Sequence, residues 1–187
     1  MKHGRVDTRN FICLLSLFLA AAGALGAQGV ENSSGHPLIL IVEPSGIFPV
    51  GDSWTWFNPG TSLRFVGGNP LGDSPWMSKV GLDLAGVPDR AGTLVYFFTY
   101  LMGLDLSWPV SDQSALGLNV AAGPSWGTLA SFRTYSIVPY GEAGVHWTSH
   151  LAPTLDFRLG TSYKLWWGTL QAVSAMAAFD VWLGGDR

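Results

Sequence analysis

The stretch Thr93–Trp108, TLVYFFTYLMGLDLSW, alternates between two kinds of side chain with a period of two. Every even position from Leu94 to Trp108 is apolar, whereas the odd positions include Gly103 and Asp105. Successive side chains of a β-strand point to opposite faces, so one face of this strand is wholly apolar. Because no stretch beyond the N-terminal region offers about eighteen uncharged apolar residues, we expect strands rather than spanning helices.

The same alternation recurs along the chain and predicts eight strands separated by turn-rich links. Proline cannot donate to a strand ladder, so Pro44-Ser45-Gly46 predicts a bulge or break in the first strand, and Pro139 disturbs the sixth. The predicted strands are Pro37–Phe48, Thr61–Gly67, Met77–Val87, Thr93–Trp108, Ala115–Trp126, Arg133–Thr148, Thr154–Trp167 and Leu170–Leu183.

The composition of the polar strand faces separates two folds that share this alternation. A soluble sandwich would present a polar face dense in Lys and Glu. Here the polar faces carry Gly, Ala, Ser and Thr with isolated charges, and only 12% of the chain is charged against 48% apolar. An apolar exterior around a narrow polar interior is typical of a closed barrel in lipid. The predicted fold class is therefore all-β, an eight-stranded antiparallel up-and-down transmembrane β-barrel.

The nine tryptophans all fall near predicted strand ends. Indole rings favour the membrane–water interface, whereas the core of a sandwich would hold several tryptophans at strand centres. If the first strand starts on the inner side of the membrane, the outer rim carries Trp54, Trp56, Trp126, Trp166 and Trp167, and the inner rim carries Trp76, Trp108, Trp147 and Trp182.

The N-terminal segment reads as a secretory signal peptide over residues 1–27. A basic start precedes the apolar run Phe11–Ala22, and small residues follow at Ala24–Ala27. An N-terminal membrane anchor is the alternative. Residues 28–36 form a flexible lead, and residues 37–187 form the barrel. The single cysteine, Cys13, lies in the apolar run, so the barrel has no disulfide or thiolate metal site.

In strand count, alternation and rim tryptophans, the chain resembles the small eight-stranded outer-membrane β-barrels. This class includes outer-membrane proteins X and W and the membrane domain of protein A. The resemblance covers nearly all of residues 37–187. It implies a bacterial outer-membrane location, with outer-membrane lipid and the barrel-assembly machinery as partners, and a monomer. Such barrels usually end on an aromatic residue, whereas this chain ends Trp182–Arg187, with Phe179, Val181 and Leu183 as the outward terminal stripe.

If the polar faces of the strands point into the barrel, the charged side chains on those faces gather in the lumen. An eight-stranded barrel is just wide enough to be filled by side chains, so we expect Arg and Lys to pair with the carboxylates. A rigid closed plug and a narrow path with a slight cation preference both remain open, because small residues such as Gly117, Ala121, Gly123 and Gly144 leave room on one wall. The predicted lumen residues are Glu43, Arg64, Lys79, Asp83, Asp105, Glu142, His146, Asp156, Arg158, Lys164 and Asp180.

The segment His146–His150 invites comparison with outer-membrane lipid A deacylases, which use a His and a Ser two residues apart on the lipid face. Here Thr148 stands at that spacing, Ser149 does not, and His146 points inward by parity. Two histidines four apart suit a metal only on a helix. The formal net charge of −3 argues against nucleic acid. We expect no catalytic site, metal or cofactor.

For function, the sequence favours restricted passage of small solutes across the outer membrane, apolar ones as the resemblance to protein W implies. The alternative is a closed structural or adhesive surface barrel without transport, and a remote one is a lipid-modifying enzyme. The outward link Val50–Gly60 carries Trp54, Trp56 and Phe57, which we interpret as interface anchors rather than a binding patch.

Overall fold

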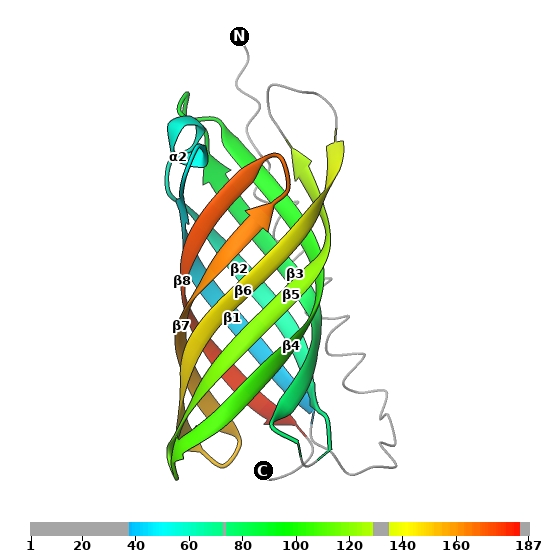
Figure 1. The fold of residues 1–187 in the computed structure, drawn as a ribbon, viewed down its shortest axis with the longest axis vertical. Helices are drawn as coiled ribbons and strands as arrows, with labels where there is room; N and C mark the ends of the chain where they lie inside the picture. Colours follow the sequence, from blue (N-terminus) through cyan, green and yellow to red (C-terminus); the bar gives the residue numbers. More distant parts are fainter. Residues whose placement is uncertain (1–37, 73, 129–134, 184–187) are drawn as a thin grey trace, which may run out of the picture. The chain divides into compact units, whose positions relative to one another are not determined.

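The computed structural model describes residues 38–72, 74–128 and 135–183, which form a closed barrel of eight antiparallel strands (Figure 1). Each strand pairs with its neighbours in the chain, and β1 closes the ring against β8. The predicted signal peptide and lead lie outside the described residues. The elements are β1 (Leu38–Pro49), α2 (Ser53–Trp56), β2 (Gly60–Pro70), β3 (Trp76–Pro88), β4 (Leu94–Ser111), β5 (Ser114–Thr128), β6 (Tyr135–Ala152), β7 (Leu155–Trp166) and β8 (Leu170–Leu183).

The prediction of an all-β up-and-down barrel is confirmed, and all eight predicted strands are present. Several of them run further than predicted, because β2 continues to Pro70, β4 to Ser111 and β6 to Ala152. A short helix, α2, lies in the first outward link, where the sequence predicts only turns. We call the end that carries α2 the α2 end, and the end where β1 begins and β8 finishes the terminal end.

The predicted bulge at Pro44 is wrong. The ladder between β1 and β8 lacks pairs at Glu43 and Pro44, yet the flanking pairs Val42↔Phe179 and Ser45↔Met176 share one register. The outward ring of Pro44 therefore removes ladder bonds without inserting a residue, and the alternation of faces runs unbroken through β1. In β6, Pro139 sits beyond the first β6–β7 pair at Tyr140, where the missing N–H leaves that ladder intact.

Large apolar side chains cover the outside of the barrel. The even positions of β4, from Leu94 to Leu104, are each 40% or more exposed, whereas Val95, Phe97 and Leu101 on the odd positions are buried. A continuous apolar surface of this kind is what a bilayer covers, and a protein in water rarely displays it. No helix in the described part of the chain has the length and hydropathy to cross a membrane.

Two glycines on adjacent strands give a matched test of this wall. A Cβ at Gly123 would lie 1.9 Å from the backbone oxygen of Tyr100, whereas a Cβ at Gly141 meets nothing within 4 Å. We expect Gly123→Ala to lower the free energy of unfolding by about 1–3 kcal/mol through overpacking. Gly141→Ala should leave it unchanged or raise it by about 0.5 kcal/mol, because alanine restricts the unfolded chain. Urea unfolding in lipid vesicles measures both, and equal effects would contradict the packing of β5 against β4.

Candidate functional site: the charged interior and the apolar plug

The structure places the eleven residues predicted for the lumen on the inward positions of their strands. Ten of them are buried, and Lys79 keeps only 9% of its side chain exposed. They fall into two ion-paired networks and one smaller group at the terminal end. Isolated charges in such a space would carry a large desolvation cost, and pairing offsets it.

The network nearer the α2 end, which we call the upper network, is centred on Arg64 of β2. Its guanidinium donates from Nη1 to Glu142 Oε1 at 2.9 Å and from Nη2 to Asp83 Oδ2 at 2.9 Å, and Nη2 also contacts Glu142 Oε2. Glu43 Oε1 lies 3.2 Å from Nη1. One arginine therefore holds three carboxylates together, which is the planar, forked recognition that guanidinium groups perform well.

Polar neighbours complete the upper network. Lys164 donates from Nζ to Asp83 Oδ2 at 2.9 Å and to Ser62 Oγ at 3.3 Å, so Asp83 binds two bases. Asn119 Nδ2 donates to Glu142 Oε1 at 2.8 Å, and the Tyr140 hydroxyl also donates to Glu142. The network thus ties β1, β2, β3, β5, β6 and β7 together inside the barrel.

The network nearer the terminal end, which we call the lower network, is centred on Asp105 of β4. Its Oδ2 accepts from Lys79 Nζ at 2.6 Å and from Arg158 Nη1 at 2.7 Å, and Arg158 reaches on to Asp180. His146 Nε2 lies 3.4 Å from Asp105 Oδ1. Two acids and two bases balance here, whereas the upper network holds three acids and two bases.

A third polar group lies near the terminal end. Asp156 accepts from the indole Nε1 of Trp182 at 2.9 Å, and its other oxygen lies 3.0 Å from His150 Nδ1. The sequence reasoning placed Asp156 in the lumen but missed His150 as its partner. The inward parity of β6, applied two residues past Thr148, would have found it.

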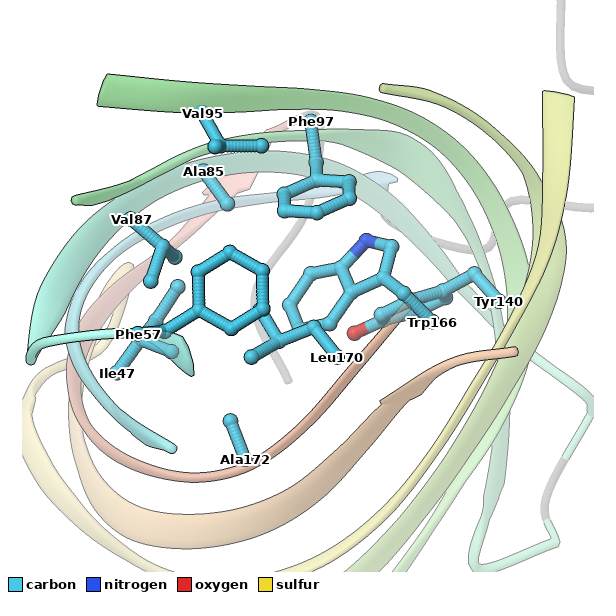
Figure 2. Close-up of a cluster of buried hydrophobic side chains, with 10 residues drawn as sticks. All are labelled: Ile47, Phe57, Ala85, Val87, Val95, Phe97, Tyr140, Trp166, Leu170 and Ala172. Carbon is cyan, nitrogen blue, oxygen red and sulfur yellow. The ribbon is translucent and has the colours of Figure 1, made fainter. Parts of the chain in front are cut away.

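An apolar plug fills the α2 end above the upper network (Figure 2). Nine of its members stand on barrel strands or at their ends, and Phe57 enters from the link that carries α2. The rings of Phe97 and Tyr140 lie 5.0 and 5.1 Å from Trp166, centroid to centroid. We define the apolar plug as Ile47, Phe57, Ala85, Val87, Val95, Phe97, Tyr140, Trp166, Leu170 and Ala172.

Three aromatic assignments are corrected by this interior. Trp166 is 0% exposed in the apolar plug, and Trp182 turns inward to Asp156, so neither is an interface anchor. Phe57 is also buried rather than anchored in lipid. Trp166 and Trp182 both stand on inward-facing positions of their strands, and this alternation decides their orientation although both lie near a rim. The other seven predicted interface tryptophans are exposed: Trp54, Trp56, Trp76, Trp108, Trp126, Trp147 and Trp167.

The His146 segment does not form a lipid-facing catalytic pair. His146 and Thr148 are both buried inside the barrel, at 3% and 6% exposure, so neither meets a lipid acyl bond from the outer face. Among the described residues, no group of three or more His, Cys, Asp or Glu side chains is arranged to hold a metal ion.

No protein-family model matches the chain, and no curated protein matches it. Among solved structures, Neisserial surface protein A (NspA) is similar, with 12% identity and a TM-score of 0.56 over 79% of this chain and 97% of that chain. The attachment invasion locus protein Ail of Yersinia pestis, in complex with the heparin analogue sucrose octasulfate, is 10% identical, with a TM-score of 0.51 over 80% of this chain and 99% of that chain. At these identities the likeness concerns the fold alone. The chain thus has the fold of the small eight-stranded outer-membrane β-barrels, with the apolar exterior that such a barrel presents to lipid.

Proposed function

We propose that this outer-membrane barrel is closed, with a structural role in the membrane and no open path for solutes. The observation that carries the proposal is the ion pair between Arg64 and Glu142. β2 and β6 stand four places apart in a ring of eight strands, so this pair crosses the full width of the lumen. A solute passing along the axis would have to break it.

Two further layers support a closed interior. Above the pair, the apolar plug occupies the α2 end with side chains from strands on all sides (Figure 2). Below it, the pair Asp105–Arg158 joins β4 to β7, and a second apolar cluster that includes Ile41 and Leu101 packs against Met77. Ions pay a high cost to enter an apolar constriction, so the plug alone opposes conduction.

A planar lipid bilayer tests the proposal directly. We expect the purified, folded protein to insert without discrete conductance steps in molar salt. Heat-modifiable migration on a gel, compared between folded and boiled samples, verifies that the inserted protein is folded. Reproducible single-channel steps from the folded wild-type protein would contradict the closed barrel.

Restricted passage of small solutes is the second candidate, and one observation favours it. Several buried polar atoms have no hydrogen-bond partner within the described part of the chain, among them His146 Nδ1, Asn119 Oδ1 and Asp180 Oδ1. Groups of this kind are commonly satisfied by internal water. Small conductance steps in the same recordings, or uptake of a small apolar solute by vesicles that contain the protein, would support this candidate instead.

Adhesion has less support. Ail was solved with a heparin analogue, and a sulfated ligand calls for several exposed bases. In the described part of the α2 end, Arg90 is the exposed base. The lipid-modifying alternative needs a reactive group on the lipid face, and His146 is buried inside. We therefore propose no enzymatic role, and unchanged acylation of lipid A from cells that produce the protein is the expected result by mass spectrometry.

A further inference from the structure

Phe57 differs from the rest of the apolar plug because it comes from a loop and not from a barrel strand. Its nine partners project from the barrel strands or the residues at their ends, whereas Phe57 follows α2 in the link between β1 and β2 (Figure 2). It is 6% exposed, although its neighbours Trp54 and Trp56 are 52% and 68% exposed. The barrel wall thus forms an apolar cup, and a loop residue fills it.

The cup suits a single aromatic ring. Aliphatic walls come from Ile47, Val87 and Leu170, and the fully buried Trp166 supplies an aromatic wall (Figure 2). Aromatic pairs prefer tilted contacts like the 34° between Phe97 and Trp166. Below the cup, Tyr140 contributes to the plug and its hydroxyl turns to Arg64 and Glu142, so the upper network forms a floor.

Arg90 holds the loop in place from the turn between β3 and β4. Its backbone N–H donates to Trp56 O at 2.9 Å, and its Nη1 donates to Asn58 Oδ1 at 2.9 Å. Nη2 contacts Trp54 O, and the guanidinium carbon lies 5.4 Å from the centroid of the Trp54 ring. The side-chain contacts belong to one exposed residue, so a single substitution removes them without touching the barrel wall.

We propose that Phe57 is a built-in, displaceable occupant of an apolar binding site at the α2 end, and that the ligand the site accepts is a single-ring aromatic molecule. Phe57 closes the site while the contacts of Arg90, together with the hydrogen bonds from Asn58 to Pro88 O and Asp89 O, hold the loop down. A ligand binds when the loop lifts, so its apparent affinity is reduced by the small fraction of open protein. The inference is independent of whether the barrel conducts, because the floor lies beneath the site.

Isoleucine methyl groups provide the readout in the whole protein. The barrel holds four isoleucines: Ile47 lines the site, Ile39 and Ile41 lie in the lower interior, and Ile137 faces outward. The probe is toluene, titrated into isoleucine-methyl-labelled protein in lipid nanodiscs. The Ile137 methyl reports toluene dissolved in the bilayer, and the Ile39 and Ile41 methyls report any change of the fold.

Three variants are compared with the wild type. Phe57→Ala empties the site, Arg90→Ala removes the side-chain contacts that help to hold the loop, and Phe48→Ala removes a lipid-facing ring from the same end of β1. We expect a saturable shift of the Ile47 methyl in Phe57→Ala. In Arg90→Ala the same shift should appear at about fivefold lower toluene than in the wild type, the equivalent of one net hydrogen bond. Phe48→Ala should match the wild type.

Two results would overturn the proposal. One is an unchanged Ile47 methyl in Phe57→Ala at saturating toluene. The other is an identical titration of Arg90→Ala and wild type, a comparison that does not depend on the folding of Phe57→Ala.

Discussion

Replacing Arg64 with alanine is expected to lower the free energy of unfolding of the barrel by about 3–5 kcal/mol. The guanidinium contacts Glu43, Asp83 and Glu142, all buried, and its loss leaves Lys164 as the one base within the upper network. Uncompensated buried carboxylates cost more than the pair itself gains, so the effect exceeds that of an exposed ion pair. Urea unfolding in lipid vesicles, followed by gel migration of the folded form, measures the change.

A double variant separates pairing from a general loss of packing. Arg64→Met together with Glu142→Leu removes one base and one acid and replaces both with apolar side chains. We expect this variant to lose less stability than the sum of its two single substitutions, because neither leaves the other partner uncompensated. Additive losses would show that Arg64 and Glu142 are not coupled across the lumen.

Trp166→Ala is expected to cost about 3–5 kcal/mol, because it empties the centre of the apolar plug. Trp166 is 0% exposed, packs against Phe97 and Tyr140, and donates from Nε1 to Thr99 Oγ1 at 3.4 Å. The cavity left behind cannot collapse easily, because the surrounding side chains are fixed on a closed sheet. The same unfolding assay provides the measurement.

The next residue is the matched control. Trp167 is 68% exposed, in the turn between β7 and β8, and its side chain lies outside the plug. Trp167→Ala should cost about 1 kcal/mol or less, the usual size of a surface substitution with some lost interface contact. If Trp167→Ala proved as costly as Trp166→Ala, the inward position of Trp166 would be contradicted.

The strands and their inward faces were predictable because the side-chain period of a β-strand is local. In a stretch such as Thr93–Trp108, the alternation of apolar and polar residues itself shows which side chains face inward, and the neighbouring strands do not change this. For the same reason, the inward placement of Arg64 and Asp105 followed from sequence. Which carboxylate each base would choose did not follow, because partners such as Arg64 and Glu142 come from strands on opposite sides of the ring.

The errors arose where a residue-type preference was set above parity or where a loop folds back. The preference of tryptophan for the interface predicts Trp166 and Trp182 there, although both stand on inward positions of their strands. Phe57 lies in a link with no periodicity, so nothing local could show that it enters the lumen. Pro44 was expected to shift the register, whereas a closed ring tolerates missing ladder bonds because both flanks of β1 stay paired.

Nitroxide scanning along β4 tests most directly whether the apolar face meets lipid and the other face a filled interior. Because Cys13 is the only cysteine of the chain, single cysteines at Tyr100, Leu101 and Met102 can be labelled specifically in protein that lacks the predicted signal peptide. The account predicts that labels at 100 and 102 collide with oxygen dissolved in the bilayer. The label at 101 should be shielded from oxygen and from a water-soluble nickel complex. Collision of the nickel complex with labels at 100 and 102 would contradict the account, because the outer face would then meet water.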